Sequence, residues 1–481
     1  MLSEYEAVIG LEVHIQLKTD SKIFCGCSTA FGGEPNIRVC PVCLGMPGVL
    51  PKINKRAVEF TIKMVLATAG TVHQESIFAR KNYFYPDLPK GYQISQYEFP
   101  IATGGAVIIK NKDGEQKRIR LSRIHLEEEA GKLFHDTDDR CSYIDLNRCG
   151  IPLVEIVTEP DLRSSEEAYL FLSKIKQIAE YLDICSGNME EGAIRCDINI
   201  SVKSKGDKNY GTRREIKNMN SLKFIKRAID YERDSQIQII KSGGNISQET
   251  MLWDEKVGVT KLMRTKEESE DYRYFPEPDL MRLEITPEWI ERVRKTLPEL
   301  PDEKYRRFIR QYGIPAYDVG VLTSSRNLAD YFEVVALVSK QPKLASNWVM
   351  VELMREIKET DISRIKVRPE NLGTLITMIA MGKISSRSAK DVFAEMVRTG
   401  RNAEEIVKAE GLKQISDKAK IEKVVKLVLD NNRVSVRKYL RGKEGLFGFF
   451  FGQVMRETNG RAEPGLVNKI LMDELNKRRG Q

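Results

Sequence analysis

The fold class of the first part of the chain is decided by residues 8–17, Val8-Ile9-Gly10-Leu11-Glu12-Val13-His14-Ile15-Gln16-Leu17. Apolar and polar residues alternate along this segment. The apolar series is Leu11, Val13, Ile15 and Leu17, and the polar series is Glu12, His14 and Gln16. A period of two is typical of a strand with one buried face. We therefore expect one face of this strand to pack on a core and the other to coordinate a ligand.

Two further segments show the same kind of pattern. Residues 195–201 place Arg195, Asp197, Asn199 and Ser201 on one polar face. Residues 153–157 read Leu-Val-Glu-Ile-Val, so Glu155 stands alone among strand hydrophobics. A buried carboxylate costs free energy unless a cation or a donor satisfies it, which makes Glu155 a candidate site residue.

More acidic residues follow His125, at Glu127-Glu128-Glu129, and occur again at Glu190-Glu191. Oxygen ligands in this number, together with an imidazole, suit Mg²⁺ or Mn²⁺ better than a second zinc ion. Each glutamate run alone is also compatible with a solvated surface. The metal interpretation depends on the recurrence of acids on polar strand faces.

Four cysteines near the start form Cys-x-Cys and Cys-x-x-Cys pairs, at Cys25, Cys27, Cys40 and Cys43. This spacing predicts a closed tetrahedral zinc knuckle over residues 25–43, with no open position for chemistry. The alternative is two disulfides, which an oxidising compartment would favour. Residues 1–7 lack the basic start and apolar core of a signal peptide, and no apolar run is long enough to span a membrane. We therefore expect a cytoplasmic protein with no membrane partner and a structural Zn²⁺.

Residues 80–92, Arg-Lys-Asn-Tyr-Phe-Tyr-Pro-Asp-Leu-Pro-Lys-Gly-Tyr, interleave basic and aromatic side chains. Such a segment can hold phosphate or stack on bases, although an aromatic packed loop is the alternative. The chain has no Walker motif of the GxxxxGK[ST] type. Any ATP would therefore be bound through metal and side chains.

The 481 residues are too many for one core. Strand-like patterns dominate up to about residue 285, the proline-rich stretch 297–302 forms a stiff boundary, and helical periodicity follows. The apolar run 446–452 is expected in the core of the last module. We predict an α+β protein with a β-rich domain at 1–296, a helical domain at 297–405 and a helical tail domain at 406–481.

The basic charge is concentrated at the end of the chain. Residues 401–481 contain 18 Lys and Arg against 11 Asp and Glu, and the first 400 residues contain 59 against 58. A basic terminal module on a nearly neutral body favours binding to a polyanion, most commonly nucleic acid. A solvated helical surface rich in lysine is the alternative.

Residues 144–156, Ile-Asp-Leu-Asn-Arg-Cys-Gly-Ile-Pro-Leu-Val-Glu-Ile, resemble the signature of the B subunit of the aspartyl/glutamyl-tRNA amidotransferases, the GatB family. The resemblance extends in order along the chain, through residues 8–14, 80–92, 125–132, 190–199 and 271–279 and a YqeY-like helical tail. It implies a β-rich cradle similar to the glutamine synthetase fold, followed by all-α modules. Zinc is expected from this sequence's cysteines, because some family members lack them.

The implied activity uses ATP to phosphorylate the side-chain carboxylate of Glu-tRNA(Gln), Asp-tRNA(Asn) or both, after which ammonia displaces the phosphate. The chain has no GxSxG nucleophile elbow and no Gly/Ser-rich amidase segment, so another chain must supply the ammonia. The resemblance names an amidase-type A subunit, a small C subunit and an ammonia channel. It also implies that the tail contacts tRNA. A non-catalytic, zinc-containing tRNA-binding scaffold remains the alternative function.

The resemblance also assigns the site residues. The ATP- and Mg²⁺-dependent centre is expected to contain Glu12, His14, Glu127, Glu128, Glu155, Glu191 and Asp197, with Glu12, His14, Glu127, Glu128 and Asp197 as magnesium candidates. Lys81 and Lys90 match positions on the ammonia path or facing the phosphates, and Asp271 and Arg273 are weaker candidates of the same kind.

Overall fold

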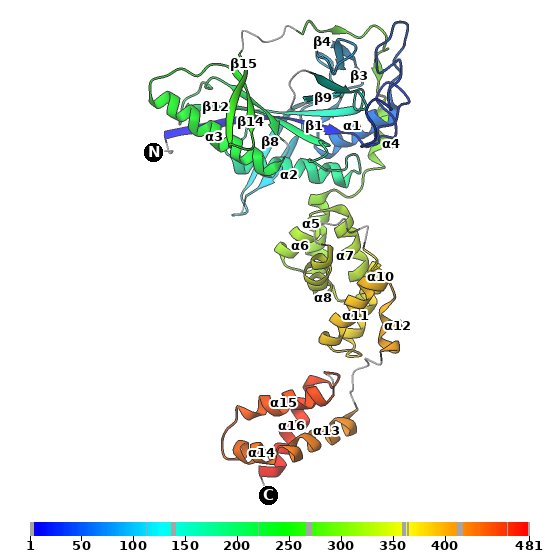
Figure 1. The fold of residues 1–481 in the computed structure, drawn as a ribbon, viewed down its shortest axis with the longest axis vertical. Helices are drawn as coiled ribbons and strands as arrows, with labels where there is room; N and C mark the ends of the chain where they lie inside the picture. Colours follow the sequence, from blue (N-terminus) through cyan, green and yellow to red (C-terminus); the bar gives the residue numbers. More distant parts are fainter. Residues whose placement is uncertain are drawn as a thin grey trace. The chain divides into compact units, whose positions relative to one another are not determined.

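The computed structural model describes residues 4–111, 113–135, 141–219, 221–265, 272–357, 362, 365–410, 417–458 and 460–479. The chain divides into two compact units, Met1–Leu300 and Pro301–Gln481. Among the described residues, those of the first unit form strands and four α-helices, whereas the second unit contains helices (Figure 1). The predicted α+β class is therefore confirmed.

A ten-stranded sheet forms the centre of the first unit, in the order β15-β14-β13-β12-β1-β11-β8-β6-β2, with β7 paired to β8. Its pairs are antiparallel except for β13 with β14. The strands are β1 (Tyr5–Gln16), β2 (Thr71–Val72), β6 (Ala102–Thr103), β7 (Ala106–Lys110), β8 (Gln116–Glu128), β11 (Pro152–Thr158), β12 (Ile194–Ser204), β13 (Arg214–Met219), β14 (Glu249–Asp254) and β15 (Val259–Thr265).

Three small sheets accompany the large one, in the orders β16-β4-β5, β10-β9 and β17-β3. Their strands are β3 (Glu75–Ser76), β4 (Ala79–Asn82), β5 (Tyr92–Ser95), β9 (Lys132–His135), β10 (Ser142–Asp145), β16 (Phe275–Pro276) and β17 (Leu283–Glu284). The sheet containing β4 and β5 is tied to the end of β8, because Ser95 Oγ donates a hydrogen bond to Glu127 Oε2 over 3.0 Å.

The helices of the first unit are α1 (Lys55–Ala67), α2 (Ser165–Tyr181), α3 (Leu222–Lys241) and α4 (Pro287–Arg294). Each begins at a residue whose side chain accepts a hydrogen bond from the first turn: Asn54, Ser164, Ser221 and Thr286. Helices α1, α2 and α3 pack against the large sheet, and their buried residues share one core with Leu11, Val13 and Ile15 of β1 (Figure 1). The predicted apolar face of residues 8–17 is confirmed, and the polar face points away from the helices.

The second unit begins where the proline-rich boundary ends, with Pro301 as the first residue of α5. Its first helices are α5 (Pro301–Tyr312), α6 (Ala316–Leu322), α7 (Arg326–Ser339), α8 (Pro342–Asn347), the π-helix η3 (Trp348–Leu353), α9 (Met354–Ile357), α10 (Pro369–Ala380), α11 (Ser386–Thr399) and α12 (Ala403–Ala409). They share one hydrophobic core.

A separate core joins α13 (Lys418–Asn431), α14 (Arg433–Leu440), α15 (Leu446–Glu457) and α16 (Pro464–Arg479). The apolar run 446–452 lies in α15, where Phe450 is buried and Phe449 is exposed. Helix α12 crosses the expected domain boundary at 405, and its Ile406 and Val407 pack in the earlier core. We propose the end of α12 as the boundary that fits this packing.

Candidate functional site

The polar faces of four neighbouring strands meet in register on the large sheet. The residue opposite His14 of β1 is Glu155 on one side and Arg195 on the other, and Glu155 of β11 is in turn opposite His125 of β8. One row further, Glu12 is opposite Asp197 of β12. Because facing residues of paired strands point to the same side of a sheet, these side chains form one polar surface.

This surface lines a cavity of about 660 Å³. The expected site residues that line it are Glu12, His14, Lys81, Glu127, Glu155 and Asp197. The lining also includes Gln93 and Ser95 of β5 and the aromatic side chains of Tyr83, Tyr97, Tyr272 and Tyr274. The polar sheet face and a group of tyrosines, called the aromatic wall, therefore line the same cavity.

The first acidic cluster joins two imidazoles and two carboxylates. His14 Nε2 lies 3.4 Å from Glu155 Oε2 and 3.5 Å from Glu127 Oε1, and His125 Nε2 lies 3.0 Å from Glu155 Oε2. Burial opposes protonation of both imidazoles, but the two carboxylates outweigh it and raise the pKa of each histidine to about 9. Burial raises the pKa of Glu155, yet His125 and His14 together hold it well below its ordinary value. Without a metal ion, protons on the histidines compensate the charge of the two carboxylates, and a cation bound by His14 would displace the proton on its ligating nitrogen.

The second acidic cluster contains Glu12, Asp197 and Glu215. Asn199 Nδ2 donates a hydrogen bond to Glu12 Oε1 over 3.0 Å, and Lys217 Nζ lies 3.2 Å from both Asp197 Oδ2 and Glu215 Oε1. Burial and the neighbouring carboxylates Glu155, Asp197 and Glu215 raise the pKa of Glu12. Repelling carboxylates of this kind favour an additional cation between them.

Both clusters have donors that fit a hard divalent cation. Within each set, His14 with Glu127 and Glu155, or Glu12 with Asp197 and Glu215, one ligand atom from every residue lies within 4.8 Å of the others. Carboxylate oxygens are the ligands that Mg²⁺ prefers, and one imidazole among them is compatible with Mn²⁺. The residues present therefore fit the expected metal.

Cationic side chains complete the cavity lining, namely Lys81, Arg123, Arg195, Arg213, Lys217 and Arg264. Lys81 Nζ lies 4.6 Å from the ring centroid of Tyr272, so its ammonium is held against the aromatic wall. Ammonium and guanidinium groups beside candidate metal ligands are suited to binding a polyphosphate.

The other expected site residues lie elsewhere. Glu128 of β8 points to the face opposite Glu127 and forms a buried ion pair with Lys90. Both line a small second cavity that also includes Cys43. Glu191 is exposed and lines a third cavity of about 670 Å³. The Arg273 carbonyl accepts a hydrogen bond from Asn82 Nδ2, and Asp271 lies outside the described residues.

Sequence reasoning did not assign several residues that the structure places in the cavity. Glu215 and Lys217 come from β13, which the sequence patterns did not single out, and His125 was noted only as a neighbour of the glutamate run. Glu129 is held by Arg195, Arg148 and Gln16, with Arg148 Nη2 at 3.0 Å and Gln16 Nε2 at 2.9 Å. The signal for His125 and Glu129 was the alternation 125, 127, 129, which puts these three on one strand face.

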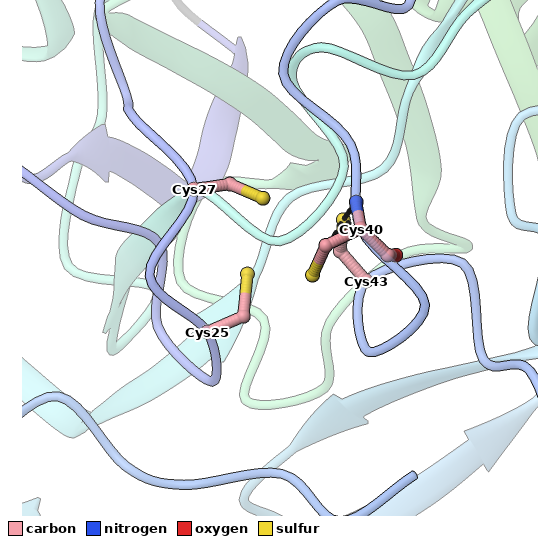
Figure 2. A group of neighbouring side chains, drawn as sticks. All are labelled: Cys25, Cys27, Cys40 and Cys43. Atoms are coloured by element: carbon pink, nitrogen blue, oxygen red, sulfur yellow. Dashed lines mark hydrogen bonds between the residues drawn. The ribbon is translucent and has the colours of Figure 1, made fainter.

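The four cysteines also converge. Cys25 and Cys27 extend from one loop and Cys40 and Cys43 from a turn, with their sulfurs directed into a common space (Figure 2). The sulfurs lie within 4.8 Å of one another, and Cys40 Sγ and Cys43 Sγ are 3.9 Å apart. A ZnS₄ tetrahedron with Zn–S bonds of about 2.3 Å has S···S edges of about 3.8 Å. All eight cysteines are free thiols, so the donor set fits zinc rather than two disulfides.

The thiols of this knuckle are already polarised. A hydrogen bond from Cys25, the backbone N–H of Cys40 and the charge of Lys22 lower the pKa of Cys43 to about 5 against the effect of burial. Burial raises the pKa of Cys27 to about 11. A metal ion bound by all four cysteines would convert the remaining thiols to thiolates.

Comparison with known proteins fits this geometry. The GatB/GatE catalytic domain family matches residues 7–291, and the GatB domain family matches residues 330–475. The chain belongs to the GatB family. Curated relatives named as the B subunit of aspartyl/glutamyl-tRNA(Asn/Gln) amidotransferase are similar over almost the whole length. The relative from Caldicellulosiruptor saccharolyticus is 53% identical over 98% of this chain and 100% of its own. The relative from Thermodesulfovibrio yellowstonii is 52% identical over 98% and 99%.

The catalytic-domain match of the GatB family covers every strand that lines the cavity. The second match begins inside α7, continues through α8, η3 and α9 to α15, and ends inside α16. Among the residues that the structure describes, no helix combines the length and apolar character that a membrane crossing requires.

Proposed function

We propose that this chain is the subunit of a tRNA-dependent amidotransferase that uses ATP to activate the side-chain carboxylate of Glu-tRNA(Gln), Asp-tRNA(Asn) or both. The observation that carries the proposal is the pair of acidic clusters in one cavity, faced by cations. The relatives bear the name of the B subunit of such an enzyme, which supports the tRNA-linked substrate.

The chemistry explains why two kinds of charge are needed. A carboxylate is a poor acyl donor because its leaving group would be oxide. One oxygen of the substrate's side-chain carboxylate attacks the γ-phosphorus of ATP. The bond from this phosphorus to the oxygen that bridges it to the β-phosphate breaks, and ADP leaves. Ammonia then adds to the carbonyl carbon of the acyl phosphate, phosphate departs with the bonding electrons, and a proton is lost to give the amide. Phosphoryl transfer of this kind depends on positioning and on neutralisation of charge.

The side chains can be given matching roles. His14, Glu127 and Glu155 would hold one Mg²⁺, and Glu12, Asp197 and Glu215 a second. Bound Mg²⁺ would neutralise the phosphate oxygens. Lys81 and Arg213 line the same cavity and would position the phosphates. His125 would hold Glu155 in place from the neighbouring strand.

The scaffold alternative requires the acidic clusters to be solvated surface. Glu127 and Glu155 are only 4% and 8% exposed, and each is in contact with imidazole nitrogen. Surface glutamate runs do not need such partners. The burial therefore favours a catalytic role over the scaffold.

The proposed enzyme works in the cytoplasm as a heterotrimer. The sequence has no glutaminase motif of its own, which supports an amidase-type A subunit as the source of ammonia and a small C subunit as its companion. Lys90 stays a candidate for the ammonia path, since it lies outside the cavity that holds the acidic clusters. Glu128, expected in the magnesium centre, lies outside that cavity as its ion-pair partner. Zinc in the cysteine knuckle would be structural, and the basic tail would contact tRNA.

The test measures ATP-dependent phosphate release with Glu-tRNA(Gln) and Asp-tRNA(Asn) in the reconstituted three-subunit complex. We expect Asp197→Asn and Glu155→Gln to lower the rate by about 100-fold or more, because each removes a carboxylate that would hold the Mg²⁺ needed to neutralise the transferred phosphoryl group. Asp207→Asn is the matched control, since Asp207 is exposed just after the same strand β12. tRNA binding should be unchanged in all three variants. Full phosphate release by both site variants would refute the proposed centre.

A further inference from the structure

Lys22 is a lysine with no solvent-exposed surface, at the start of the cysteine knuckle. Its Nζ donates hydrogen bonds to the Arg38 carbonyl over 2.7 Å and to the Leu146 carbonyl over 3.4 Å. The third donor is directed at Cys43 Sγ, 3.7 Å away. All three protons of the ammonium are therefore used.

Two of these three acceptors are neutral carbonyls and cannot compensate the charge. Burying an ammonium group without a nearby anion costs roughly several kcal/mol of folding free energy, even after the protein relaxes around it. The two carboxylates of the small cavity that Lys22 helps to line are Glu128 and Asp279. Glu128 is paired with Lys90, and Asp279 with Arg80. Among the described residues that line this cavity, the cysteine sulfurs are the remaining source of negative charge for Lys22.

A zinc ion bound by four thiolates has two formal negative charges in excess. Such a site is stabilised by donors to its sulfurs, and the Cys40 N–H already provides one to Cys43 Sγ at 3.1 Å. We infer that Lys22 is the buried counter-ion of the zinc knuckle, and that it holds the knuckle to residues 146–150 through the charge of the metal site.

The connection to residues 146–150 consists of direct contacts. Besides the bond from Lys22 to Leu146, the Cys149 thiol donates to the Cys43 carbonyl over 3.3 Å, and the Ile23 N–H donates to the Gly150 carbonyl over 2.8 Å. Gly150 N–H in turn donates to the Glu129 carbonyl over 2.8 Å. Glu129 lines the cavity that holds the two acidic clusters. Loss of the ammonium would leave the excess negative charge of the metal site without its counter-ion beside this segment.

The experiment measures zinc affinity of the full-length chain by competition with a chelator of known affinity. Lys22→Met keeps the length of the side chain and removes the charge, so we expect zinc to bind about 10- to 100-fold more weakly. Lys22→Arg keeps the charge and should stay within a few fold of the parent protein. Lys18→Met is the matched control, because Lys18 is largely exposed and pairs with Asp183. It should bind zinc like the parent.

Cobalt supplies a second readout that does not depend on activity or on the affinity alone. The Co²⁺-substituted Lys22→Met protein should keep the absorption bands of a tetrahedral thiolate site, which shows that four ligands remain while binding is weaker. Equal zinc affinity in Lys22→Met and Lys18→Met would overturn the inference. A loss in Lys22→Arg as large as in Lys22→Met would also overturn it, because Lys22 would then only fill space.

Discussion

At the scale of single residues, Glu155 shows how the chain holds a charge inside a strand. Its neighbours Val154 and Ile156 are fully buried, whereas its own side chain meets His14 and His125 from the two adjacent strands. The sequence predicted that Glu155 needs a cation or donor. It could not name His125 as one of them, because that contact depends on the register between β8 and β11.

Glu129 is the second buried carboxylate at this scale, and it has two guanidinium partners. Burial raises the pKa of Glu129, but the positive charges of Arg195 and Arg148 lower it by a larger amount. The pKa of Glu129 is therefore below its ordinary value. A carboxylate whose pKa is depressed in the folded state adds stability above its unfolded pKa of 4.5, and this stability is lost as the pH falls through the folded value. The ion pairs should therefore stabilise the protein at neutral pH.

We predict that Glu129→Gln lowers the free energy of unfolding at pH 7 by about 2 kcal/mol, below the roughly 3–5 kcal/mol of a fully buried pair because both arginines are partly exposed. The difference from the parent should shrink as the pH falls below 4.5. Urea unfolding followed by tryptophan fluorescence at several pH values measures it, since Trp253 and Trp289 lie in this unit. Glu284→Gln, at an exposed position, is the control. A difference independent of pH would contradict the ion-pair explanation.

At the scale of elements, strand alternation separates residues that the sequence groups together. The run Glu127-Glu128-Glu129 was treated as one acidic cluster. In the structure, Glu127 and Glu129 face the cavity that holds the two acidic clusters. Glu128 faces Lys90 on the other side of the sheet. The period of two was available in the sequence. The sequence did not show which residues each face of the strand contacts, because Lys90 and Glu128 are far apart along the chain.

The alternation predicts different effects for adjacent glutamates. Glu127→Gln should reduce ATP-dependent phosphate release by about 100-fold or more, since it removes a candidate metal ligand. Glu128→Gln should keep phosphate release near the parent rate but lower the free energy of unfolding by about 3 kcal/mol, because it leaves Lys90 buried without an anion. Phosphate assays and urea unfolding of both variants measure the two effects. Equal loss of phosphate release in two folded variants would contradict this assignment.

Other elements show how far local patterns reach. Apolar residues recur with helical spacing at 372–379 and 389–396, which lie in α10 and α11, and at 467–475, which lies in α16. These could be predicted because the period of a helix is written in consecutive residues. The contribution of strand β13 could not be predicted in this way, since Glu215 and Lys217 reach the site only through the pairing of β13 with β12. The alternation therefore located Glu12, His14 and Asp197, whereas Glu215 and Lys217, which pairing brings to the site, were missed.

At the scale of the whole molecule, the charge of the tail coincides with a separate core. Residues 411–481 contain 16 Lys and Arg against 8 Asp and Glu. Helices α13–α16 pack on one another around their own cluster of buried residues, and α12 belongs to the preceding core. A truncation before α12 would expose the core around Ile406, so a deletion aimed at the tail should keep α12.

We predict that deleting residues 411–481 weakens the binding of tRNA by the full three-subunit complex and reduces its salt dependence. The slope of log affinity against log salt should fall by roughly 0.7 to 0.9 for each phosphate that the tail neutralises. Because the residues that line the cavity of the two acidic clusters belong to the first unit, nucleotide binding should be preserved. Arg437→Gln with Lys438→Gln, at exposed positions in the last turn of α14, should reproduce part of the change with the tail still folded. Binding titrations between low and physiological salt measure both quantities, and an unchanged slope in the deletion would show that the excess positive charge faces solvent rather than tRNA.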